Sequence, residues 1–301
     1  MCGIVGLYLK NEALQPQLGA LFSPLLIEMT DRGPDSAGIA VFRNATAAGQ
    51  TKLTLFHPDA GYGWPGLADR LAAAFEATTT LEHHDSHVVL VTNAPADLAA
   101  DWISAQDEQL QIMSRGSAIE IYKETGLADD ILARFDVPGM AGTHAVGHTR
   151  MATESAVTTD GSHPFSTGAD LCLVHNGSLS NHNRLRARLA KEDGIQCRTQ
   201  NDTEVAAAFI SSRLAKGRSL HQALDDCIGA LDGFYTFVAG TRDGFAVLRD
   251  PIACKPAVLA ETEDYVAFAS EYRALVSLPG VADAKVWEPE PAIVYSWGDK
   301  T

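Results

Sequence analysis

The chain has few basic residues and no long apolar run. It contains 23 Lys and Arg against 38 Asp and Glu, a formal net charge of −15 over 301 residues. Nucleic acids and anionic membranes attract basic surfaces, so this balance argues against both as partners. No stretch approaches the roughly 18 apolar residues that indicate a transmembrane helix. No basic segment followed by an apolar one marks a secretory signal. These absences predict a globular protein without a membrane segment.

Paired cysteines are also missing. The five cysteines are scattered, and no two of them form a C-x-x-C pair. They are Cys2, Cys172, Cys197, Cys227 and Cys254. This pattern argues against a disulfide framework, a zinc site and an iron–sulfur cluster, and it favours a reducing cytoplasm.

Neither an internal repeat nor a glycine-rich phosphate loop is present. The opening segment GIVGLYL fits a strand that is covered on both faces, and the apolar spacing predicts a helix over 16–29. Residues 44–140 combine predicted helices near 67–77 and 96–105 with the strand HVVLVT and a hairpin within LQIMSRGSAIEIY. We therefore expect an inserted lobe over about 44–140.

Closely spaced strands are predicted in the second half. Helices are expected over 181–190, 203–215 and 220–231, followed by the strands FYTFVAG, FAVLRD, PAVLAE, YVAFAS and AIVYSW. Short apolar strands at regular spacing are typical of antiparallel sheets. Two such sheets with helices outside them make a layered α+β domain.

Cys2 follows the initiator methionine directly. Because a small residue at this position normally leads to removal of the methionine, we expect the mature chain to begin at Cys2. A thiol and a terminal amine then lie on one residue, and these are the groups that a nucleophile and its base require. The pKa of free cysteine is about 8.5 and that of a terminal amine about 7.7–8.0, so the amine can accept the thiol proton near neutral pH. The alternative is a small apolar residue at a frayed end.

Four polar clusters stand at or after the ends of predicted strands. They are RGPDSAG at 32–38, GHTRMAT at 147–153, VHNGSLSN at 174–181 and NDTEV at 201–205. Each has an ordinary structural explanation on its own: a surface arginine, an Asn-Gly turn or a helix cap. Together with Cys2, they contain every part that acyl transfer from an amino-acid amide requires.

These parts can be assigned by chemistry. The Asn176 side chain and the Gly177 backbone can donate hydrogen bonds to a tetrahedral oxyanion. Arg150 suits an α-carboxylate, and Asp202 suits an α-ammonium. The nearby histidines lack the spacing of a metal site, so we expect them to be hydrogen-bonded scaffold: His144, His148, His163 and His175.

The chain resembles the class-II glutamine amidotransferase (glutaminase) domain, a member of the N-terminal nucleophile hydrolases. The resemblance rests on motifs in this order: MCGIVG, RGPDSAG, GHTRMAT, HPF, HNGSLSN and NDTEV, followed by RDP, KP and FASE. It covers 1–301 as a single domain, apart from the longer segment at about 44–140. It implies a four-layer αββα sandwich of two antiparallel sheets.

The resemblance also implies roles for individual residues. Cys2 would be the nucleophile, and Asn176 with Gly177 would form the oxyanion hole. The expected substrate-binding residues are Arg150, Thr153, Asp202 and Arg32, with Arg32 in the loop that packs over the nucleophile. The chain departs from some relatives at Met151, where they have an aromatic residue. Glu154 adds a negative charge near Arg150, which favours weaker glutamine binding.

The RDPIACKPAVL and FASEYRAL segments are similar to the amidotransferase subunit of N-methylglutamate synthase and to GlxB-like subunits of glutamate-synthase-like complexes. This similarity implies L-glutamine as substrate, no cofactor in this chain, and a hetero-oligomer with synthase subunits, one of them flavin-bearing. Three alternatives stay open. They are a catalytically quiet structural or regulatory subunit, an N-terminal-cysteine acylase for another amide, and an amidotransferase of purine or amino-sugar synthesis that lacks its synthase domain.

Overall fold

Two stacked antiparallel sheets form the centre of the computed structural model, which describes residues 2–152 and 156–298. The seven-stranded sheet has the order β14-β12-β13-β1-β8-β2-β7, and the four-stranded sheet has the order β15-β11-β10-β9. The strands of the first are β1 (Gly3–Leu9), β2 (Ser36–Phe42), β7 (Ile119–Thr125), β8 (His144–Arg150), β12 (Val258–Glu261), β13 (Tyr265–Ala269) and β14 (Lys285–Trp287). Those of the second are β9 (Leu171–Leu179), β10 (Gly233–Thr241), β11 (Gly244–Arg249) and β15 (Val294–Gly298).

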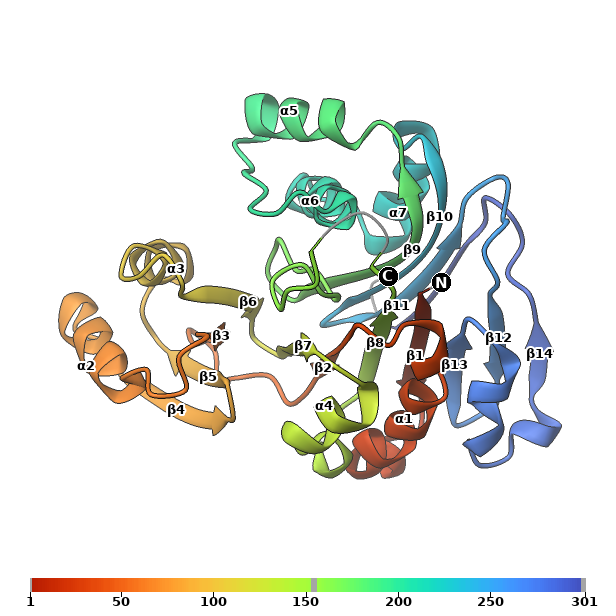
Figure 1. Ribbon diagram of the computed structural model, residues 1–301, viewed down its shortest axis with the longest axis horizontal. Coiled ribbons are helices and arrows are strands. Elements are labelled where there is room, and N and C mark those ends of the chain that lie inside the picture. Colours follow the sequence, from red (N-terminus) through yellow and green to blue (C-terminus); the bar gives the residue numbers. More distant parts are fainter. Residues whose placement is uncertain (1, 153–155, 299–301) are drawn as a thin grey trace.

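Alternation along the strands divides the apolar residues between three layers of core. On β1, Ile4 belongs to the core between the sheets, whereas Val5 and Leu7 face helices on the outside. The helices α1 (Leu18–Ile27) and α4 (Ala128–Arg134) cover the outer face of the seven-stranded sheet. The helices α5 (His182–Asp193), α6 (Asp202–Ala215) and α7 (Leu220–Ala230) cover the four-stranded sheet (Figure 1). The predicted αββα sandwich is thereby confirmed.

A separate lobe extends from the sandwich, at the left of Figure 1. Its sheet has the order β4-β5-β3-β6, and α2 (Trp64–Phe75) and α3 (Ala96–Ser104) pack on it. The strands are β3 (Thr51–Phe56), β4 (Thr79–His84), β5 (His87–Thr92) and β6 (Gln111–Gly116). We expected the insertion over about 44–140; the elements of the lobe occupy a shorter part of that range, because β7 and α4 belong to the sandwich.

The predicted hairpin across LQIMSRGSAIEIY is wrong. The strand β6 pairs with β3 in the lobe, and β7 pairs with β2 in the sandwich, so the turn between them carries the chain from one sheet to the other. Asp170 fixes this turn, since its carboxylate accepts hydrogen bonds from the backbone of Ser117, Ala118 and Ile119 at 2.8–3.0 Å.

Short elements complete the fold. The helix predicted over 16–29 begins as a 3₁₀ helix, η1 (Glu12–Gln17), before α1 continues it. The other 3₁₀ helices are η2 (Thr30–Arg32), η3 (Val137–Gly139), η4 (Tyr272–Ser277) and η5 (Val281–Asp283). The three-residue edge strand β14 was not predicted, because its segment is too short to show a pattern. Within 2–152 and 156–298, no helix has the length and apolar character needed to cross a membrane.

Candidate active site

Cys2 lies at the end of the seven-stranded sheet where β8 finishes. The antiparallel register pairs Gly3 with Thr149, so the start of β1 and the end of β8 bring Cys2 and Arg150 close together. The Cys2 carbonyl accepts two hydrogen bonds, from Arg32 Nε at 3.0 Å and from Asn176 Nδ2 at 3.2 Å. The side chain is half-buried, and its Sγ lies 4.0 Å from the Met151 carbonyl oxygen. The backbone of Cys2 is therefore held by one side chain from η2 and by one from β9 of the four-stranded sheet.

Arg32 supports Cys2 rather than lining the cavity beside it. Its Nη1 pairs with the Glu271 carboxylate while its Nε reaches the Cys2 carbonyl. The hydrogen bond from Arg32 lowers the pKa of Glu271, and the charges of Arg32 and Arg273 act in the same direction. We expected Arg32 among the substrate-binding residues; the structure places it against the backbone of the expected nucleophile.

The free edge of β9 presents the backbone of Gly177. Opposite it on β10, both the N–H and the carbonyl of Tyr235 bond to Asp250 on the far side, so neither points at β9. Antiparallel pairing then directs the Gly177 N–H away from β10, off the edge of the sheet. The Leu179 N–H, two residues further on, points the same way and donates to Asp202 Oδ2 at 2.8 Å. No acceptor for the Gly177 N–H is found in the part of the chain that the structure describes.

Packing explains why position 177 holds a glycine. Its φ is +155°, a conformation that side chains disfavour, and an added Cβ would lie 1.9 Å from the Phe234 carbonyl oxygen. The same Cβ would lie 2.7 Å from His175 Nε2. The bare backbone thus exposes an amide that a larger residue would displace.

Asp202 is the first residue of α6, and it does not cap that helix. The cap is Asn201, whose side chain accepts from the Thr203 N–H at 2.9 Å, and this leaves the Asp202 carboxylate available elsewhere. Burial alone would raise the pKa of Asp202, but His175, 3.7 Å away, and the Leu179 N–H lower it to about 2. The carboxylate is therefore ionised at neutral pH, as an ammonium partner requires.

Three buried histidines stand behind Asp202 as hydrogen-bonded scaffold. His148 Nε2 donates to the His175 carbonyl at 3.1 Å. His163 Nε2 and His175 Nδ1 both bond to the Thr203 hydroxyl, at 2.8 and 3.0 Å. Burial lowers the pKa of His148 to about 3 and that of His163 well below its ordinary value, so both rings are neutral. The Thr203 hydroxyl thus joins two of these histidines. Its role was not predicted, although Thr203 belongs to the NDTEV motif.

These groups meet around one cavity of about 790 Å³. Arg150 is 6% exposed, and its Nη1 donates to the Ala156 carbonyl at 3.3 Å. The lining includes five of the predicted site residues, namely Cys2, Arg150, Asn176, Gly177 and Asp202. It also includes His163, His175, Thr203 and Lys255, which were not predicted to belong to it. Thr153 and Glu154 lie outside the described residues.

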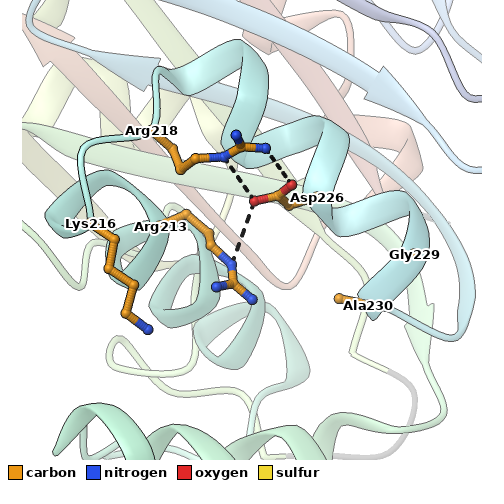
Figure 2. Close-up of a pocket in the computed structure, with 6 residues that line it drawn as sticks. All are labelled: Arg213, Lys216, Arg218, Asp226, Gly229 and Ala230. Carbon is orange, nitrogen blue, oxygen red and sulfur yellow. Dashed lines mark hydrogen bonds and ion pairs between the residues drawn. The ribbon is translucent and has the colours of Figure 1, made fainter.

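A second hollow, of about 470 Å³, lies between α6 and α7 (Figure 2). Arg218 Nη2 and Nε contact the Asp226 carboxylate at 2.7 and 3.2 Å, and Arg213 Nε lies 3.7 Å from it. Lys216 also lines the hollow and pairs with Asp193 at 2.5 Å. The lining contains no cysteine, serine or threonine. Across 2–152 and 156–298, no three His, Cys, Asp or Glu residues are grouped to hold a metal ion.

Known proteins match this chain in sequence. A family model described as a glutamine amidotransferase domain matches residues 148–277. The glutamine amidotransferase-like protein GlxB of Rhizobium meliloti (strain 1021) is 56% identical over 99% of this chain and 98% of its own length. The chain belongs to the class-II glutamine amidotransferase family. The family predicted from the ordered motifs is confirmed.

Solved structures match this family member in fold. One, described as the allosteric regulatory enzyme of purine biosynthesis, gives a TM-score of 0.61 at 20% identity, over 99% of this chain and 47% of that one. Another, the glutamine phosphoribosylpyrophosphate amidotransferase from B. subtilis, gives 0.58 at 20% identity, over 99% and 49%. The amidotransferase chain described here spans about half the length of these solved relatives and shares their fold over that half.

Proposed function

We propose that this chain hydrolyses L-glutamine to L-glutamate and ammonia, with Cys2 as the nucleophile. The observation that carries the proposal is a single cavity lined by a thiol, an outward backbone N–H, an arginine and an ionised carboxylate. Each meets a different part of the substrate: the amide carbon, the oxyanion, the α-carboxylate and the α-ammonium. An acylase for other amides would not need both Arg150 and Asp202.

In the proposed reaction, Cys2 Sγ attacks the amide carbon of the glutamine side chain while the terminal amine takes the thiol proton. The Asn176 amide and the Gly177 N–H donate to the oxyanion. When the intermediate collapses, the carbon–nitrogen bond breaks, and the proton passes from the amine to the nitrogen, which leaves as ammonia. Water then cleaves the γ-glutamyl thioester, releasing glutamate and restoring the thiol.

The test begins with mass spectrometry of the intact protein, whose mass should correspond to a chain that starts at Cys2. The full chain is then incubated with L-glutamine, alone and with its partner subunits, and glutamate and ammonia are measured. Equal amounts of both products are expected. Cys2→Ala should abolish them without changing Tm. A folded chain that starts at Cys2 and yields neither product, even with its partners, would favour the structural or regulatory alternative.

We also infer that the ammonia passes to a synthase partner in an N-methylglutamate synthase or glutamate-synthase-like complex, with a flavin in a partner subunit and none in this chain. The support is the 56% identity to a protein named GlxB together with the RDP and FASE segments. All five cysteines are free thiols, which suits a reducing compartment such as the cytoplasm. Purification from the native cell should bring synthase subunits and a flavin absorbance with the chain. A lone chain with full activity would count against the complex.

A further inference from the structure

Lys123 is a buried ammonium group close to the cavity. It lies on β7, an edge strand of the seven-stranded sheet, and is 3% exposed. By alternation it shares the inner face of β7 with Ile119 and Ile121, which belong to the core between the sheets. A cation in such a place needs partners that replace its hydration.

Backbone carbonyl groups supply those partners. Lys123 Nζ donates to the carbonyl oxygens of Asp160 at 3.1 Å, Ser162 at 2.8 Å and Pro164 at 3.3 Å. An ammonium has three N–H groups, and these three acceptors use all of them. The Phe165 ring lies 4.6 Å from Nζ and adds a cation–π contact. The Lys123 side chain thus donates hydrogen bonds to alternate carbonyl groups of the segment 160–164.

No carboxylate lies within ion-pair distance of Lys123 among residues 2–152 and 156–298. The Asp160 carboxylate pairs instead with Arg198 at 3.3 Å. Burial lowers the pKa of Lys123 to about 7; the charges of Arg198 and Arg150 act in the same direction, while Asp160 and Glu204 oppose them. An apolar side chain would fill this space without that penalty, so packing alone does not account for a lysine here.

The segment 160–164, which Lys123 holds, lines part of the cavity. Asp160, Gly161 and His163 line it, and His163 bonds to Thr203 beside Asp202. The underside of the segment is fitted closely to β2: a Cβ on Gly38 would lie 2.2 Å from the His163 carbonyl oxygen and 2.5 Å from Lys123 Cβ. The segment therefore has β2 beneath it, Lys123 holding its carbonyls, and the cavity on its other side.

We propose that Lys123 is a positioning residue, which holds the segment 160–164 in the shape that completes the glutamine cavity. The inference rests on the proposed function, since it takes glutamine as the occupant. The residues expected to act on the amide group, Cys2, Asn176 and Gly177, belong to other elements, and loss of the ammonium leaves them in place. The effect of a variant should accordingly fall on KM rather than on kcat.

Lys52 offers a matched control, because it is a second buried lysine. It is 6% exposed, and its Nζ contacts Glu120 at 2.7 Å, joining the lobe to β7. Glu120 also accepts from the Tyr122 hydroxyl at 2.8 Å. Lys52 does not line the cavity. A change at Lys52 tests the loss of a buried ammonium without disturbing the segment 160–164.

The experiment compares wild type, Lys123→Met, Lys123→Arg and Lys52→Met as full chains, by steady-state glutamine hydrolysis, thermal unfolding and hydrogen exchange of the amides in 158–165. For Lys123→Met we expect KM to rise at least tenfold with kcat within threefold, and faster exchange in 158–165. Lys123→Arg, which keeps the charge and the donors, should recover part of the KM. Lys52→Met should lower Tm and leave KM within twofold. If Lys123→Met does not fold, Lys123→Gln, which retains two N–H donors, takes its place.

The outcomes separate the two proposals. A folded wild type without glutaminase activity, alone and with partner subunits, overturns the proposed function. Hydrogen exchange then reports alone on whether Lys123 orders the segment. An active wild type with an unchanged KM in Lys123→Met overturns the positioning role and leaves the glutaminase intact. An equal rise in KM for Lys52→Met also overturns it, because the effect would then follow from lost stability anywhere.

Discussion

The cavity beside Cys2 and the hollow between α6 and α7 are both lined by charged side chains, but they differ in how far their polar groups are already bonded. In the hollow, two arginines share the Asp226 carboxylate and Lys216 takes Asp193. In the cavity, the Gly177 N–H points off the edge of a sheet and meets no acceptor within the described residues. Charges that neutralise one another make a surface ion-pair cluster. A candidate active site needs hydrogen-bonding capacity left for a ligand.

The largest effect expected from this comparison concerns Gly177. In Gly177→Ala the new Cβ would meet the Phe234 carbonyl and displace the outward N–H. Loss of one oxyanion donor typically lowers kcat by about 10²–10³-fold. Glutaminase kinetics with circular dichroism checks this. Gly194→Ala is the control, since Gly194 also has a positive φ, +70°, but no atom within 4 Å of an added Cβ. Equal losses in both variants would mean that the backbone strain, and not the N–H, carries the effect.

Asp202→Asn should weaken glutamine binding next most strongly. A hydrogen bond between charged groups contributes about 1.5–3 kcal/mol, so KM should rise about 10- to 100-fold. Asp226→Asn removes the central carboxylate of the other hollow and should leave KM within twofold. Similar KM values for all three proteins would remove Asp202 from the binding site and weaken the contrast between the hollows.

The stability of the fold should show the ionisation of Asp202. Its folded pKa, about 2, lies below the ordinary value of 3.8, so its contribution is complete above about pH 4 and is lost as the pH falls toward 2. The difference in unfolding free energy between wild type and Asp202→Asn should be about 2 kcal/mol at neutral pH and shrink below about pH 4. Urea unfolding across this range measures it. A difference that stays constant down to pH 3 contradicts the assignment.

The smallest effect is expected in the hollow of Figure 2. Arg218 and Asp226 are partly exposed, at 41% and 28%, and such pairs contribute about 0.2–1 kcal/mol. Arg218→Ala should therefore lower the unfolding free energy by no more than about 1 kcal/mol and leave glutamine kinetics unchanged. A clear loss of glutaminase activity would show that the ion pairs of this hollow affect the cavity. The hollow could then no longer be treated as a surface ion-pair cluster without a part in function.

Much of the sandwich and of the cavity lining could be predicted because each motif is local. Cys2 borders β1 and Arg150 ends β8, and neighbouring antiparallel strands of one sheet bring such ends together. Asn176 lies within β9 of the other sheet, where the Asn-Gly pair of its own motif marked it. The boundary of the lobe could not be predicted in this way. Residues 110–122 have the pattern of a hairpin, but β7 pairs in another sheet, and the carboxylate that fixes the turn before it comes from Asp170, far along the chain. The role of Lys123 could not be predicted either. Its partners are backbone carbonyl groups on a distant segment, and the sequence of that segment does not mark them as acceptors.

The free edge of β9 affects the tendency of the protein to aggregate as well as its chemistry. An unpaired strand border invites another chain to add itself as a further strand. Here Leu173 bridges to Phe165, the carbonyl of His175 is taken by His148, and the amide of Leu179 is taken by Asp202. Within the described residues, the stretch around Gly177 between these contacts is only a few residues long, which is too short to pair with a strand of another chain. A border protected against aggregation can in this way still offer one amide to a small molecule.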